Sequence, residues 1–154
     1  MTRTWTLVAA LALLAVLAPL LAPYAPDAID LANRRQGPSA AHWFGTDDLG
    51  RDVLSRALAG GRVSLAIGLL SALVAAVLGV GVGAVAGYVG GWTDTLLMRA
   101  TDAVLSMPRL LLLMVAAATL QPALPALVLL VGAVGWMETA RVTRAAVRGL
   151  AARE

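Results

Sequence analysis

Four ionisable residues lie at or near the ends of long apolar segments, where a charged side chain is costly. Asp94, Arg99 and Asp102 follow the second apolar segment, and Glu138 lies near the end of the last one. A charge at membrane depth costs about 2.5–3.5 kcal/mol on insertion scales. These carboxylates are therefore candidates for a proton relay or an ion path.

A structural interpretation of the same residues is favoured, because they cluster at segment ends and not at mid-bilayer. Arg99 and Asp102 are three residues apart, a spacing that predicts a pair on one helix face. Glu138 is expected to pair with Arg141 or Arg144. Under this interpretation the charges fix helix ends at the interface and carry no ions.

Two other motifs were weighed as ligand sites and rejected. His42 is the single histidine, beside Trp43 and Phe44, and no acidic-and-serine constellation stands next to it; a loop anchor is expected. The acidic run at 47–52 lacks the alternating ligand spacing and terminal glutamate of a calcium loop, and it contains Arg51.

Missing residue types exclude several function classes. The chain has no cysteine and no lysine, so thiolate metal sites, thiol nucleophiles, Schiff bases and a P-loop lysine are excluded. The arginines sit at the ends of apolar segments with few aromatics between them, which does not favour nucleic-acid binding. We expect no enzyme, no cofactor and no metal site.

The elements that position these residues are membrane spans. Of 154 residues, 60% are hydrophobic and 14% are charged, against roughly a quarter charged in soluble domains. Uncharged stretches of 23, 31 and 28 residues lie between Arg3 and Asp27, Arg62 and Asp94, and Arg109 and Glu138. About 20 apolar residues cross the hydrocarbon layer. The chain is predicted to be an all-α membrane protein.

Four spans are predicted, at about 5–22, 63–88, 97–120 and 126–140, with a tight turn at 121–125. The loop at 23–62 begins irregular and then turns helical from Thr46. This short amphipathic surface helix, with Asp47–Arg51 and Asp52–Arg56 as i,i+4 pairs, is expected to end at the glycines 60 and 61. Two parts result: 1–62, a span plus an extracytoplasmic loop, and 63–154, three spans of a core.

A row of small residues marks the second span. Ala75, Gly79, Gly83 and Gly87 recur every fourth residue on one helix face. In lipid such a stripe lets another helix approach closely, so van der Waals contact drives association. We expect a helix-packing face there.

Arginine placement predicts the orientation. With four spans, one side carries seven arginines in short segments, namely Arg3, 99, 109, 141, 144, 148 and 153. The other side carries five in a 40-residue loop that also holds five aspartates. Basic residues in short loops stay cytoplasmic, so both termini are expected in the cytoplasm.

Several motifs resemble one family. The run 42–56 leading into 60–65, the run 87–94, and then 97–99, Asp102 and 107–108 are similar, in the same order, to inner-membrane permeases of bacterial ABC importers for dipeptides, oligopeptides and nickel. The likeness is to the C-type member of the permease pair. The residues that carry it are Gly45, Thr46, Asp47, Gly50, Arg51, Asp52, Ser55, Arg56, Gly90, Gly91, Trp92, Asp94, Arg99, Asp102 and Pro108.

The resemblance implies a six-span permease of the bacterial plasma membrane. It implies four kinds of partner: a homologous second permease, two ATP-binding subunits, an extracytoplasmic substrate-binding protein and the lipid bilayer. Residues 140–154 resemble the approach to the family's ATPase-docking EAA loop, so the chain is expected to be truncated before that loop and the last two spans.

Two alternatives stay open beside the permease. The chain could be a standalone membrane protein that acts by helix packing, as a regulator or assembly partner. It could also be an ion-coupled carrier that uses Asp102 and Glu138. The transported substrate cannot be read from these motifs.

Overall fold

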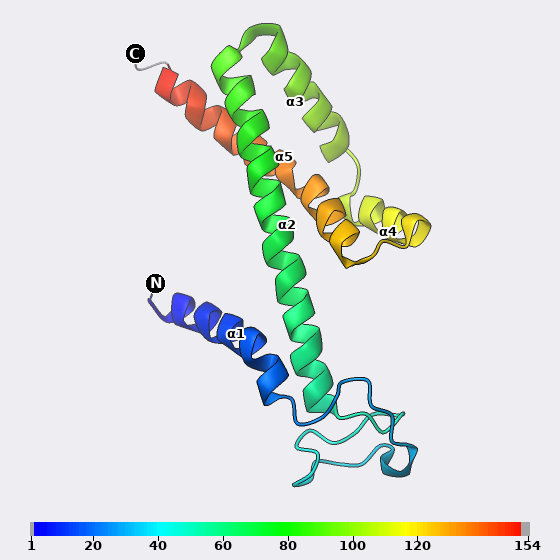
Figure 1. Cartoon of the computed structure of the whole chain (residues 1–154). Coiled ribbons are helices and arrows are strands. Elements are labelled where there is room, and N and C mark those ends of the chain that lie inside the picture. The colour runs from blue at the N-terminus through cyan, green and yellow to red at the C-terminus, as the bar shows by residue number, and fades with distance from the viewer. Residues whose placement is uncertain (1, 152–154) are drawn as a thin grey trace. The chain divides into compact units, whose positions relative to one another are not determined.

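The computed structural model describes residues 2–151, and every regular element in that range is a helix (Figure 1). The elements are α1 (Thr2–Leu21), the 3-10 turn η1 (Leu31–Asn33), α2 (Val53–Val89), α3 (Gly91–Leu105), α4 (Arg109–Leu120) and α5 (Leu124–Ala151). The prediction of an all-α chain is confirmed for this range. Arg153 and the side chain of Arg3, both used in the orientation argument, lie outside the described parts.

Two helices, α2 and α5, are long and apolar enough to cross a membrane. Helices α3 and α4 are long and apolar enough only if they are taken together as one bent span, and the number of spans is then three. Within α1 the described apolar part covers 12–21 and is shorter than a span. An integral membrane chain is therefore supported, with two to three spans evident.

The predicted surface helix at the start of α2 is wrong. Residues 46–52 form turns with one isolated bridge between Thr46 and Asp52, and α2 then runs unbroken for 37 residues through Gly60 and Gly61. A glycine costs only about 1 kcal/mol in a helix interior, whereas a helix broken in lipid leaves backbone groups unsatisfied. At 1.5 Å per residue α2 is about 55 Å long, more than the roughly 30 Å of hydrocarbon.

The predicted third span is interrupted. α3 ends at Leu105 and α4 begins at Arg109, with a bend of 77° between them. Pro108 lies in the break; it lacks an N–H, and it disfavours helical backbone at the residue before it. The predicted span at 97–120 contains Pro108 and no break.

Glycines and an αL residue form the turns at either end of this segment. Gly90, with φ of +66°, is the N-cap residue of α3. Gln121 ends α4 in the left-handed region, at φ 42° and ψ 54°. Pro122 follows directly, so the turn predicted at 121–125 is confirmed.

The chain divides into two compact units, residues 1–66 and 67–154. The first contains α1, the loop and the start of α2. The second contains the rest of α2 and helices α3 to α5. Each unit is described by itself below.

Candidate functional site

In the second unit, the glycine row of α2 lies directly against α5. Gly79, Gly83 and Gly87 are all buried. A Cβ atom at Gly79 would come within 2.5 Å of the Cβ of Thr139, and one at Gly87 within 2.9 Å of the Cβ of Val147. At Gly83 it would overlap the α5 backbone. Glycine is therefore required at each position for the two helices to approach this closely.

The register of this contact shows that α2 and α5 run parallel. Ser71 donates a hydrogen bond to the carbonyl of Val128 (3.1 Å), and sixteen residues further along α2 Gly87 meets Val147. The residue numbers of α2 and of α5 both increase in the same direction along the contact, as they do for parallel helices. Two parallel helices that both cross a membrane need an odd number of crossings between them, and only α3 and α4 lie between.

α3 is joined to α5 by ion pairs. Asp94, in the first turn of α3, is buried, and its carboxylate accepts hydrogen bonds from two arginines of α5. Arg144 binds both carboxylate oxygens, with Nη2 2.6 Å from Oδ2, and Arg148 Nη2 lies 2.5 Å from Oδ2. Bidentate arginine–carboxylate contacts fix geometry as well as charge. Asp94 is thus the anchor of α3.

A second pair lies further along the same helices, and it corrects two predictions. Asp102 pairs with Arg141 of α5, not with Arg99. Glu138 pairs with neither Arg141 nor Arg144, since both bind aspartates of α3. The predicted partners lie within one helix, whereas antiparallel packing of α3 on α5 brings opposite charges of the two helices together.

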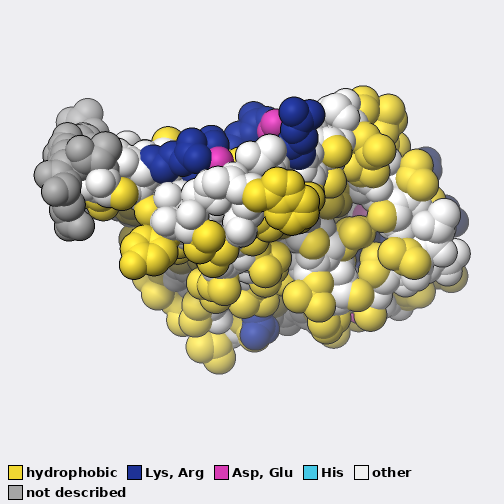
Figure 2. All heavy atoms as spheres, turned by 90° about the horizontal axis from the view of Figure 1, so that it is seen from above, with side chains coloured by type: hydrophobic (Ala, Val, Ile, Leu, Met, Phe, Trp, Pro, Cys, Tyr) yellow, Lys and Arg dark blue, Asp and Glu magenta, His cyan; other side chains and the backbone are white. Residues whose placement is uncertain are grey.

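These arginines form a basic edge on one face of the chain. Figure 2 shows Arg side chains gathered in a band with acidic side chains between them. Arg141, Arg144 and Arg148 of α5 form ion pairs with Asp94 and Asp102 of α3. Because Asp102 has an arginine partner, the charges here form structural pairs and not a relay of free carboxylates.

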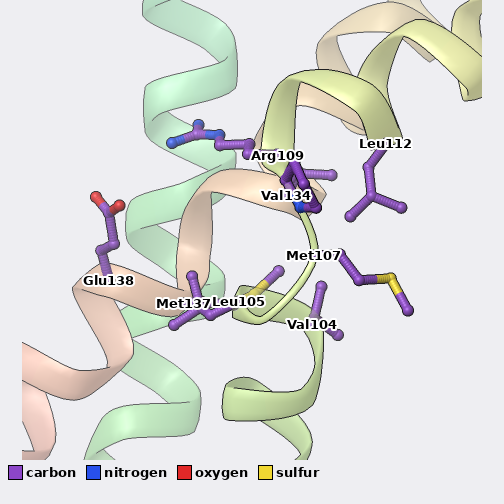
Figure 3. A pocket seen from close by; sticks show the side chains of 9 residues that line it. Val104, Leu105, Met107, Arg109, Leu112, Val134, Met137 and Glu138 are labelled. Carbon is purple, nitrogen blue, oxygen red and sulfur yellow. The ribbon is translucent and has the colours of Figure 1, made fainter.

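A pocket opens at the break between α3 and α4, on the side of α5 (Figure 3). Its volume is about 310 Å³. Most of the lining is apolar, and the two charged members are Arg109 and Glu138. The remaining lining residues are Val104, Leu105, Met107, Pro108, Leu112, Val134 and Met137. Motif residue Pro108 therefore creates the hollow by breaking the helix, a role the sequence analysis missed.

In the first unit, Asp47 organises the loop before α2. Its carboxylate accepts hydrogen bonds from the backbone N–H groups of Leu49 (2.8 Å) and Arg51 (3.0 Å). It also binds the guanidinium groups of Arg51 (2.9 Å) and Arg56. Burial alone would raise the pKa of Asp47, but these donors outweigh it and lower the pKa to about 2.

The predicted pair Asp52–Arg56 is absent, because Asp52 turns inward. Its carboxylate lies 3.0 Å from His42 Nδ1 and accepts from the N–H and hydroxyl of Ser55, each at 2.8 Å. Burial acts to raise the pKa of Asp52, and the Ser55 and His42 hydrogen bonds lower it overall. The ring of His42 also stacks on Tyr24, with centroids 4.7 Å apart.

This cluster corrects the statement that no acidic-and-serine group stands near His42. It is still no catalytic triad, because the hydroxyl of Ser55 donates to Asp52 and not to the imidazole that would have to activate it. Ser55 Oγ also accepts from the N–H of Tyr24 at 3.2 Å. His42 therefore anchors the loop, as expected.

The two loop glycines of the motif are required by the backbone conformation. Gly45 and Gly50 have φ of +73° and +77°. A Cβ at Gly45 would clash with the carbonyl of Gln36, and one at Gly50 with that of Asp30. Thr46 holds the same turn: its hydroxyl accepts from the N–H of Gln36 at 2.9 Å.

Among the residues that the structure describes, no three His, Cys, Asp or Glu side chains are grouped as metal ligands would be. The remaining motif residues have structural or exposed positions. Trp92 is exposed near the start of α3, and Arg99 is exposed on the same helix. Gly91, the first residue of α3, has φ of +55°.

Comparison with known proteins decides the family. The profile of the binding-protein-dependent transport system inner membrane component matches residues 79–153, and that of the N-terminal TM domain of oligopeptide transport permease C matches residues 6–38. The chain belongs to this permease family. The resemblance found in the motifs is confirmed, and the family consists of membrane permeases and not enzymes.

Individual relatives agree with this assignment. The dipeptide transport system permease protein DppC of Bacillus subtilis is 38% identical over 131 residues, which is 85% of this chain and 41% of the relative. The probable D,D-dipeptide transport system permease protein DdpC of Escherichia coli is 46% identical over 112 residues, 73% of this chain and 38% of the relative.

The oligopeptide transport system permease protein OppC of Bacillus subtilis is 36% identical over 132 residues, 86% of this chain and 43% of the relative. The chain spans about two fifths of the length of these curated relatives.

Proposed function

We propose that this permease chain forms the N-terminal part of the translocation path in an ABC importer for small peptides. The observation that carries the proposal is the parallel pairing of α2 and α5 with α3 fixed on α5 by Asp94. It gives a membrane core within the matched region 79–153. The dipeptide and oligopeptide permeases among the relatives support a peptide cargo.

The proposal includes a topology of four spans in this chain, out of six in the whole permease fold. α1 crosses first, and α2, the bent pair α3–α4 and α5 follow. The parallel direction of α2 and α5 supports one net crossing by α3–α4. Both termini then face the cytoplasm, and the loop before α2 faces outward.

The partners are part of the proposal. A homologous second permease pairs with this chain, two ATP-binding subunits drive transport, and an extracytoplasmic binding protein delivers the substrate near the loop of the first unit. ATP has to be bound by other chains, because this sequence has no P-loop lysine.

Topology can be tested directly because the chain has no cysteine. Single cysteines replace Ser39 in the loop and Gly149 in α5, and intact cells are treated with a membrane-impermeant maleimide. We expect labelling at position 39 and none at position 149 until the cells are permeabilised. Labelling of both positions in intact cells would contradict the proposed orientation.

Function is tested by uptake. The chain is expressed with the second permease, ATP-binding subunits and binding protein encoded beside it, in a host that lacks peptide permeases. ATP-dependent uptake of radiolabelled alanyl-alanine is expected. An assembled complex that hydrolyses ATP but takes up no peptide would overturn the proposed cargo.

A further inference from the structure

The pocket at the α3–α4 break combines two opposite charges that do not neutralise each other. Among the residues that the structure describes, neither Arg109 nor Glu138 forms an ion pair. The other two acidic side chains of the described part of this unit are paired: Asp94 and Asp102 both bind arginines of α5. Arg109 and Glu138 are therefore the two charges of the pocket lining that remain available to a ligand.

The two side chains reach the same side of the pocket from different helices (Figure 3). The guanidinium of Arg109 lies over Gly135 of α5, where a Cβ would be only 3.2 Å from Nη2. Glu138 is three residues further along α5, on the same helix face and about 4.5 Å along the axis. The guanidinium of Arg109 thus lies about one helical turn from the α5 position that carries Glu138.

The space between these charges is small and apolar. About 310 Å³ is at the lower end of the range for small-molecule pockets. Met107, Leu112 and Met137 line it, so they can contact aliphatic groups. The ammonium and carboxylate ends of a free dipeptide are about 6–7 Å apart along the extended backbone. A ligand of this length is small enough for a pocket of this volume.

We propose that this pocket is a subsite for a small zwitterion of the dipeptide class. The ligand carboxylate binds Arg109 and its ammonium group binds Glu138. Hydrogen bonds between charged groups are about twice as strong as neutral ones, and the apolar lining residues can contact the aliphatic side chains of the peptide. This inference rests on the proposed function and narrows its cargo to short peptides with free termini.

A nickel cargo does not fit the same pocket. Its lining offers a single carboxylate, no imidazole and no thiolate. A nickel ion needs several nitrogen or oxygen ligands, among which imidazole is well suited, and one carboxylate does not supply them. The guanidinium of Arg109 would also repel the cation. Zwitterionic lipid headgroups share part of the ligand chemistry, and the test below separates them from peptides.

The test measures binding of radiolabelled alanyl-alanine to the purified full chain by equilibrium dialysis in lipid-free detergent. The probes are alanyl-alanine, its N-acetyl form and its C-terminal amide. The variants are Arg109→Gln and Glu138→Gln, with Arg99→Gln as the matched control, since Arg99 is exposed on α3 and does not line the pocket.

Each pocket variant is expected to weaken alanyl-alanine binding at least about tenfold, while Arg99→Gln leaves binding unchanged. The pairing of charges gives a readout that misfolding cannot mimic. Acetylation removes the ammonium charge of the peptide, so it should weaken binding to the wild type and to Arg109→Gln but cause no further loss of affinity in Glu138→Gln. Amidation removes the carboxylate charge, so it should cause no further loss of affinity in Arg109→Gln.

Three results would overturn the subsite: equal binding by both pocket variants and the wild type, effects of acetylation that do not depend on Glu138, or displacement of the peptide by NiCl₂ alone. Binding of phosphatidylethanolamine with no binding of alanyl-alanine would identify a lipid site instead and would also overturn it. Intact dipeptide binding without uptake by the assembled complex would count against the proposed function only. Uptake that both pocket variants leave unchanged would count against the subsite only.

Discussion

The two units of this chain are stabilised in opposite ways. In the first unit, carboxylates such as Asp47 and Asp52 accept hydrogen bonds from several donors and define an irregular loop. In the second unit, glycines allow α2 and α5 to touch, and few polar contacts connect these two helices. Water competes for every loop hydrogen bond, whereas lipid offers no hydrophobic drive for helix association, so close contact has to supply it.

The largest effect is expected at the helix contact. Gly83→Leu should disrupt α2–α5 packing, because its Cβ would already overlap the backbone at Ala140 and the rest of the side chain has nowhere to go. Overpacking costs about 1–3 kcal/mol or more. We expect a marked drop in the thermal unfolding temperature of the purified chain in detergent.

Gly81→Leu is the matched control, because a Cβ at Gly81 meets nothing within 4 Å on the same helix. It should unfold at nearly the wild-type temperature. Equal loss of stability in both variants would mean that helix propensity, and not the contact with α5, explains the glycines.

The next largest effect is expected at Asp94. Asp94→Asn removes the charge that holds Arg144 and Arg148, so two cations are left without their partner. We expect α3 to loosen from α5, measured as faster hydrogen exchange of α3 amides by mass spectrometry.

Asp102→Asn is the comparison for that variant. Asp102 is more than half exposed and binds one arginine only, so exchange in α3 should change less. A larger effect at Asp102 than at Asp94 would contradict the assignment of Asp94 as the anchor.

Acid should loosen the loop before it affects the helices. The pKa of Asp47 in the folded chain is about 2, below the value of about 3.9 for an unfolded aspartate. A lowered pKa stabilises the fold above pH 4, and this stabilisation is lost as the pH falls from about 4 toward 2. Hydrogen exchange at Leu49 and Arg51 amides should rise across that window.

In Asp47→Asn, hydrogen exchange at these amides is expected to be fast already at neutral pH. It should not rise further below pH 4, because no carboxylate at position 47 remains to be protonated. If the wild-type loop kept its protection at pH 2, the carboxylate would not be its organising group.

The smallest effect is expected at the turn between α4 and α5. Gln121 adopts a left-handed conformation that glycine accepts more readily. Gln121→Gly should therefore stabilise the chain by up to about 1 kcal/mol. Gln121→Ala keeps the strain and should give no gain in unfolding temperature; a gain from alanine alone would point to helix propensity instead.

Long uncharged stretches predicted the helical membrane chain, and Pro122 with its neighbours predicted the turn, because both signals are local. The break at Pro108 was missed because its apolar surroundings resemble one continuous span. The helix through Gly60 and Gly61 was missed because glycine signals an end in water and less so in a long apolar helix.

The candidate site was harder to predict than the fold. Asp94, Asp102 and Glu138 could be singled out as costly charges, but their partners depend on which helices meet. Arg109 of the pocket was counted only for the orientation. Asp102 was assigned to Arg99 of its own helix, whereas it binds Arg141 of α5. Asp47 binds the predicted Arg51 and also Arg56. To predict ion pairs between different helices, one must know the register in which the helices pack. A local sequence pattern does not contain this information.

The parallel pairing of α2 and α5 has a consequence for biosynthesis. Ser71 and its acceptor Val128 are 57 residues apart, so at 5–20 residues per second the ribosome needs roughly 3–11 seconds to make the second after the first. During that interval α2 is inserted with its glycine stripe uncovered. Whatever occupies the stripe meanwhile, whether lipid, an insertase or a neighbouring subunit, must leave before α5 can dock.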